Sequence, residues 1–151
     1  MTVHVLTLST GTSRGRETDG YTIVRLLDET TGKRYRCMGG GYDMQGTVFG
    51  EWLQDVYQRE LREIADQAYS RTVAALNTDN SRDPFTLERT VNEHGLYGMS
   101  LRADGSVYLD GACGMSSMER IAKALQLRVQ WRSTPRGRTV GFTVTDMRGE
   151  L

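Results

Sequence analysis

The chain has 151 residues, of which 38% are hydrophobic and 25% are charged, and nineteen basic residues balance nineteen acidic ones. This size and composition fit one folded domain and indicate neither disorder nor a polyelectrolyte partner. Sequence-independent DNA binding requires more Lys and Arg than acidic residues, and this chain has no such excess. Nucleic acid is therefore possible as a partner but not favoured.

The potential metal ligands and thiols are few. Cys37 and Cys113 match neither a zinc spacing nor a disulfide scaffold, and His4 and His94 are isolated from each other. We therefore expect reduced thiols, no metal site and no cofactor. No apolar stretch approaches the roughly eighteen residues that span a bilayer, and the first residues show no leader pattern. We expect a cytoplasmic protein with no membrane partner.

The first third of the chain predicts strands. Val3 to Ser9 alternates apolar and polar residues, as a half-buried strand does, and the glycine-rich residues 10–20 predict a loop. Tyr21 to Leu27 and Lys33 to Met38 predict a hairpin, because the DETTG between them supplies turn residues.

A long helix is expected next. Apolar residues recur at helical spacing from Phe49 to Leu76, and neither Gly nor Pro interrupts Glu51 to Asn77. Unbroken, this helix of roughly 27 residues would be about 40 Å long, more than a compact monomer needs. We therefore expect either a break near Ser70 or an apolar stripe shared with another subunit, and hence a homo-oligomer.

Residues 77–84 predict a loop, and Phe85 to Asn92 predicts a short helix. Asp104 and Gly105 predict a hairpin between two alternating runs, since both turn positions then need positive φ. Ser116 and Glu119 form the pattern of a capping box at the start of another amphipathic helix.

The C-terminal part predicts two more strands, over Val129 to Arg132 and Thr139 to Asp146. The whole order predicts an α+β fold, in which a mainly antiparallel sheet of hairpins packs against one long and one shorter helix.

Two glycine-rich segments each lead from a predicted strand into a predicted helix. A glycine-lined helix start exposes backbone N–H groups at the positive end of the helix dipole and can bind phosphate or carboxylate. The alternative is that the glycines serve only positive φ and close packing. Asp43 would either cap the helix itself or repel an anion at the first segment. The second segment has no such acid and adds Ser116 and Ser117 as donors, so it is preferred. The candidate residues are Gly39, Gly40, Gly41, Gly111, Cys113, Gly114, Ser116 and Ser117.

Arginines gather near the C-terminus, at Arg128, Arg132, Arg136, Arg138 and Arg148. With Trp131 and Phe142 among them, they predict a basic, aromatic surface that grips phosphates, for which Arg132, Arg136 and Arg138 are the candidates. The alternative is a solvated strand face.

An enzyme is not favoured. Cys113 precedes a predicted helix, where the dipole lowers a thiol pKa, and His94 with Asp110 would complete a nominal Cys-His-Asp set. No spacing in the sequence shows that these residues converge, and buried cysteines acting as small apolar residues are commoner.

The segments GGGYDMQGTVFGEWL and YLDGACGMSSMERIAKAL resemble small accessory proteins encoded by tailed bacteriophages. That resemblance implies a protein acting in the host cytoplasm, with counter-defence as one role. The leading hypothesis is a non-enzymatic protein that sequesters an anionic, phosphorylated or nucleotide-like small molecule. The alternative is an inhibitor or assembly factor that binds a host protein through the long helix's apolar stripe and Trp52.

Overall fold

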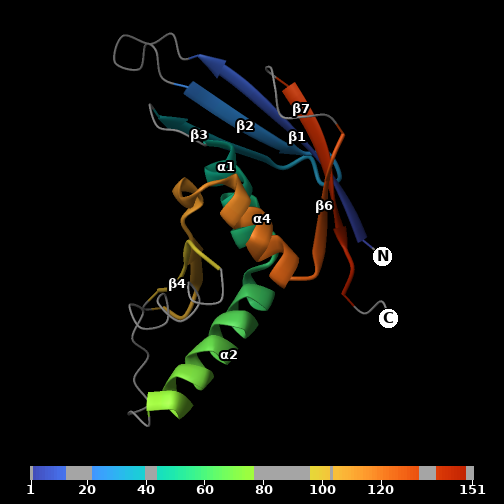
Figure 1. Cartoon of the computed structure of the whole chain (residues 1–151). Coiled ribbons are helices and arrows are strands. Elements are labelled where there is room, and N and C mark those ends of the chain that lie inside the picture. Colours follow the sequence, from blue (N-terminus) through green and yellow to red (C-terminus); the bar gives the residue numbers. More distant parts are fainter. Residues whose placement is uncertain are drawn as a thin grey trace.

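A computed structural model describes residues 2–12, 22–39, 44–76, 96–102, 104–132 and 139–148, and of these it describes only the backbone for Thr12 and residues 68–76. Its main element is an antiparallel sheet in the order β3-β2-β1-β7-β6 (Figure 1). The strands are β1 (Thr2–Thr12), β2 (Thr22–Asp28), β3 (Arg34–Gly39), β6 (Leu127–Trp131) and β7 (Thr139–Asp146).

The described helices lie on one side of this sheet (Figure 1). They are α1 (Met44–Val56), α2 (Gln58–Leu76), the short 3-10 helix η1 (Gly111–Cys113) and α4 (Met115–Ala124). A separate two-stranded sheet of β4 (Met99–Leu101) and β5 (Val107–Leu109) packs beside them. The predicted α+β fold, a mainly antiparallel sheet with helices on it, is confirmed.

Strand alternation divides the sheet into two faces. Leu6, Leu26 and Phe142 are fully buried on the face that meets the helices, which we call the core face. The residues between them in sequence point the other way, onto what we call the outer face. Arg25 and Thr7 are examples, and they are exposed and half-buried, respectively. No described helix lies over this second face.

The predicted long helix bends earlier than expected. α1 ends at Val56 and α2 begins at Gln58, so the bend lies at Tyr57 and not near Ser70. The hydrogen-bond ladder still crosses it, because the Tyr57 N–H donates to the Leu53 carbonyl and the Leu61 N–H to the Tyr57 carbonyl. The helix also begins earlier than predicted, at Met44, and includes Gly46 and Gly50.

The apolar stripe of this helix pair is used inside the molecule. Trp52 is fully buried, and its indole N–H donates to the Asp28 carboxylate at 3.0 Å. The other buried members of the stripe are Val48, Phe49, Leu53, Tyr57, Leu61 and Ala65. The hypothesis of protein binding through this stripe therefore lacks the exposed Trp52 that it requires.

Two glutamines of the helix pair hold the β4–β5 hairpin. The Gln58 amide donates to the Val107 carbonyl at 3.1 Å and accepts from the Val107 N–H at 2.6 Å, as a neighbouring strand would. Gln54 accepts from the Leu109 N–H at 3.0 Å. These bonds pair the free edge of β5, so a two-stranded sheet suffices here.

The predicted Asp104–Gly105 hairpin is present, but its turn differs from the expectation. Gly105 adopts positive φ and Asp104 does not. The Asp104 carboxylate instead accepts from the N–H and hydroxyl of Ser106, which closes a wider loop. The predicted loop over residues 10–20 is wrong at its start, because β1 continues to Thr12 and pairs there with β2. Residues 13–20 of that loop, the predicted loop over residues 77–84 and the predicted helix over Phe85 to Asn92 lie outside the described residues.

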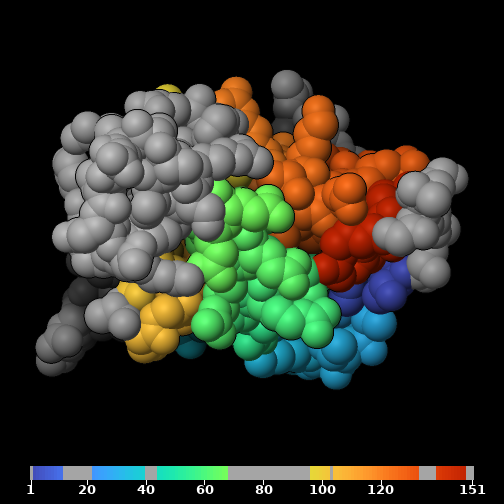
Figure 2. Space-filling view, turned by 90° about the horizontal axis from the view of Figure 1, so that it is seen from below, coloured from blue at the N-terminus to red at the C-terminus, as the bar shows by residue number. Residues whose placement is uncertain are grey.

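Viewed from below, the described part of the helix pair is on the surface, between the β4–β5 hairpin and the segment that contains α4, β6 and β7 (Figure 2). Among the helices of the described ranges, none is both long and apolar enough to cross a bilayer.

Candidate anion-binding site

The first glycine junction is described only at its edge. Gly39 is the last residue of β3 and pairs with Thr22. Gly40, Gly41 and Asp43 lie outside the described residues. The prediction of an anion site at this junction therefore stays a prediction.

The glycines of the second junction bring backbones together. Gly111 is buried, and a Cβ atom there would overlap the Gly46 carbonyl and the Thr47 Cα. Conversely, a Cβ on Gly46 would lie 2.6 Å from the Gly111 carbonyl oxygen and 2.7 Å from the Met115 nitrogen. The start of α4 thus packs directly on the backbone of α1, which agrees with the close-packing alternative.

The predicted capping box at this helix is wrong. α4 begins at Met115, so its N-cap is Gly114, which has φ of 114° and provides no side chain to cap with. Ser117 donates from its hydroxyl to the Cys113 carbonyl at 3.3 Å, and Glu119 accepts from the Trp131 indole at 2.8 Å. Ser116 is exposed one residue inside the helix.

The nominal thiol set is not assembled among the described residues. Cys113 is exposed at the end of η1, and Asp110 caps that helix by accepting from the Ala112 N–H at 3.1 Å. His94 lies outside the described residues. Burial raises the pKa of the other thiol, Cys37, to about 11, which disfavours its thiolate. Within the same ranges, no three His, Cys, Asp or Glu side chains gather to hold a metal.

The predicted basic, aromatic surface at the C-terminus is only partly formed. Arg128 and Arg132 lie on the outer face, but Trp131 packs against the core and Phe142 is fully buried in it, since neighbouring residues of a strand point to opposite faces. The expected aromatic interleaving is therefore wrong. Arg136 and Arg138 lie outside the described residues.

Arg148 is not part of this surface. Its guanidinium pairs with Asp146 and with Glu60 at the sheet's end and lies 5.2 Å from the centre of the Tyr57 ring. These carboxylates raise the pKa of Arg148, so it is a fixed cation inside an ion-pair network.

A basic group that the sequence reasoning missed lies on β2 and β3. Arg25 and Arg36 stand directly opposite each other across the two strands, and Arg34 is two residues away on the same face. All three are exposed, and we call them the arginine triad. None of the three forms an ion pair with a described residue. The sequence feature that could have predicted this group is the KRYRC run, which places two arginines two residues apart in a predicted strand.

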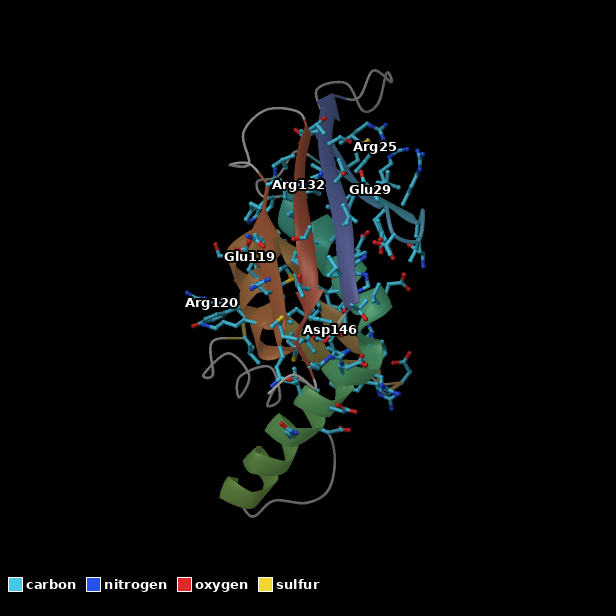
Figure 3. All side chains as sticks on the ribbon, turned by 90° about the vertical axis from the view of Figure 1, so that its right-hand side faces the viewer. Arg25, Glu29, Glu119, Arg120, Arg132 and Asp146 are labelled. Atoms are coloured by element: carbon cyan, nitrogen blue, oxygen red, sulfur yellow. The ribbon has the colours of Figure 1, made fainter. Side chains whose placement is uncertain are left out.

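The triad surrounds a hollow of about 330 Å³ on the outer face, which we call the arginine pocket. Figure 3 looks onto the sheet in front of α1, with Arg25 on one side and Arg132 on the other. The outer-face side chains lining the pocket are Thr7, Ser9, Arg25, Leu27, Arg34 and Arg36.

One acid lies beside the pocket. Glu29 follows β2, and its carboxylate accepts from the Thr7 hydroxyl at 2.8 Å (Figure 3). Among the described strands and their turns, the strand register places no other acidic side chain next to Thr7 on this face. The basic side chains described on the outer face are therefore Arg25, Arg34, Arg36, Arg128 and Arg132, and the acidic side chain beside them is Glu29.

The core face of β3 anchors the triad. The Tyr35 hydroxyl and the Lys33 ammonium both donate to the Asp55 carboxylate on α1. These bonds hold the pKa of Asp55 below its usual value, whereas burial and the bond to Asp55 raise that of Tyr35. Because β3 alternates, tying Tyr35 to α1 fixes Arg34 and Arg36 on the opposite side.

Comparisons with protein-family models, with curated proteins and with solved structures find no match for this chain.

Proposed function

We propose that this protein binds a small phosphorylated ligand of nucleotide size in the arginine pocket and holds it without chemical change. The sequence hypothesis of an anion-sequestering protein is thereby kept, and its site moves from the glycine junctions to the outer face of the sheet.

The arrangement of Arg25 opposite Arg36 carries this proposal. Like charges directly opposite each other in a sheet are destabilising, and neither arginine forms an ion pair with a described residue. Guanidinium groups bind phosphate through paired, charge-assisted hydrogen bonds. A bound phosphate would therefore relieve the repulsion between Arg25 and Arg36.

The size and lining of the hollow favour a nucleotide over a bare ion. Its volume of about 330 Å³ is at the lower end of the range for small-molecule sites. Leu27 provides an apolar floor between polar walls, on which a base or sugar can lie, and the Ser9 hydroxyl adds a hydrogen-bonding group. Phe142 is fully buried and Trp131 is half-buried against the core, so the two do not form the aromatic platform that single-stranded nucleic acid uses.

Sequestration is the proposed role, because the described residues that line the pocket include no catalytic set. In an accessory protein of a tailed phage, the class that the sequence resembles, such a pocket would withhold a host nucleotide signal. We keep counter-defence as the proposed setting on that resemblance.

The test is a thermal-shift screen with inorganic phosphate, AMP, ADP and cyclic dinucleotides, followed by calorimetry. We expect at least one nucleotide to raise the melting temperature. Arg36→Gln should weaken its binding by about tenfold or more, since a hydrogen bond to a charged group contributes about 1.5–3 kcal/mol.

The matched control is Arg120→Gln, which removes an equally exposed arginine from α4. It should bind as the wild type does. The proposal fails if millimolar nucleotides produce no shift, or if Arg36→Gln and Arg120→Gln bind equally well.

A further inference from the structure

Arg132 reaches from the far edge of the sheet toward the arginine pocket. It directly follows β6, and its backbone N–H donates to the Gly141 carbonyl at 2.8 Å. Its guanidinium extends across β7 to β1, where Nη2 donates to the Leu6 carbonyl at 3.3 Å and lies 3.5 Å from the Thr7 hydroxyl. Thr7 lines the pocket, so Arg132 stands at its edge.

Gly141 allows the Arg132 side chain to extend across β7. A Cβ atom at position 141 would overlap the Arg132 guanidinium, which lies flat over the glycine. The backbone φ at Gly141 is not in the left-handed region, so the strand itself does not require glycine. The residue's missing side chain is what admits the guanidinium.

The strand register places Arg132 and Arg34 at opposite ends of one row. Arg34 pairs with Leu27, Leu27 with Thr7, and Thr7 with Gly141, beside Arg132. Thr7 and Arg34 are two strand spacings apart, or about 10 Å. Arg132 therefore faces the triad across Leu27, with an apolar floor between two cationic walls.

We propose that Arg132 forms a second phosphate subsite, so that the arginine pocket selects ligands with two phosphate groups on either side of a sugar. This inference rests on the proposed function and adds the ligand class. One phosphate binds the triad, the nucleoside lies over Leu27, and the other phosphate binds Arg132. Contiguous phosphates, as in ADP, reach the triad alone.

Calorimetry with AMP, ADP and adenosine 3′,5′-bisphosphate tests this assignment. We expect the wild type to bind the bisphosphate about tenfold more tightly than ADP, because only the bisphosphate pairs with both cationic walls. Arg132→Gln should bring the two affinities to within about twofold and leave AMP unchanged.

Gly141→Ala is the second variant, since it displaces the Arg132 guanidinium without altering any charge. It should lose the same preference as Arg132→Gln. Arg128→Gln is the matched control, because Arg128 lies on the strand that precedes Arg132 and on the same face, but it pairs with Thr145, in another row. It should keep the preference, and urea unfolding should show that each variant is folded.

The outcomes separate the two proposals. If no probe binds the wild type, the proposed function fails and this inference fails with it. If AMP, ADP and the bisphosphate all bind and Arg132→Gln keeps the preference, only the second subsite is overturned. A preference lost equally in Arg128→Gln would also overturn it, because the effect would then follow net charge.

Discussion

Arg25 and Arg36 on the outer face are not the residues that would give this sheet its highest stability. An exposed strand pair is stabilised by β-branched or oppositely charged cross-strand neighbours. Here Arg25 faces Arg36 instead, while Lys33, next to the triad in sequence, is ion-paired with Asp55. The triad forms no ion pair with a described residue and gathers at one hollow, which supports the binding role proposed for these positions.

Arg36→Thr should therefore stabilise the free protein while it weakens ligand binding. Removing one of two facing charges and adding a β-branched residue should raise the free energy of unfolding by about 0.2–1 kcal/mol. Urea unfolding without ligand measures this change, and calorimetry measures the loss of affinity.

Arg128→Thr provides the comparison, since Arg128 faces Thr145 and not another cation. It should gain less stability than Arg36→Thr. Equal or lower stability of Arg36→Thr would show that the facing arginines carry no repulsion, which removes the main support for the pocket.

At the scale of elements, the contact between η1 and α1 explains the glycines that the sequence made conspicuous. Gly46 and Gly111 meet through their backbones, and Gly114 links η1 to α4. Glycine is needed wherever two backbones approach this closely. The glycines of the second junction thus serve close packing of α4 and η1 on α1. A phosphate-binding segment also uses glycines to let its ligand approach the backbone, so the two look alike in sequence.

Gly111→Ala should destabilise the protein with no ligand present. The added methyl group would overlap backbone atoms of α1, which cannot rotate away as a side chain can. Overpacking of this kind typically costs about 1–3 kcal/mol, which urea unfolding would resolve.

The control for this variant is Gly11→Ala in β1, where the nearest atom to an added Cβ is 3.9 Å away, on the flexible Arg25 side chain. Its stability should match or exceed that of the wild type. If Gly111→Ala were as stable as Gly11→Ala, the packing role of this junction would be wrong.

At the scale of the whole molecule, a cluster around His4 joins the sheet to the helices. The His4 Nε2 atom lies 3.0 Å from the Tyr57 hydroxyl, and the ring meets Trp52 edge-on. The other ring nitrogen, Nδ1, is buried without a hydrogen-bond partner. Burial lowers the pKa of His4 below 6.5, although Asp28 and Asp146 oppose this shift.

Stability should therefore decrease as the solution becomes acidic. The unfolded chain takes up a proton on His4 near pH 6.5, whereas the folded protein does so only at lower pH. Because the unfolded state binds more protons in that range, the contribution of His4 is complete above about pH 6.5 and is lost as the pH falls. Unfolding in urea at several pH values would show the decrease.

His4→Gln should reduce this decrease, because the titrating group is gone, and His94→Gln should retain the part due to His4. A pH dependence that is unchanged in His4→Gln would contradict the assignment.

Much of the fold followed from local pattern. The strands, the Asp104–Gly105 hairpin and both amphipathic helices were predicted, because period and turn chemistry act over a few residues. The bend at Tyr57 was not, since hydrogen bonds continue across it and no Gly or Pro marks it. The capping box failed by two residues: the N-cap of α4 is Gly114 and not Ser116, and contact of Met115 with Gly46 fixes this end of the helix.

The sequence by itself determined which residues share a face, since alternation in a strand is a local property, and it located Arg132 as a candidate. Only the tertiary structure decided which candidates meet. β1 pairs with β2 on one side and with β7 on the other, which brings Arg25, Thr7 and Arg132 onto one surface. Pairing between the two ends of the chain depends on the packing of the whole core, and no local pattern encodes it.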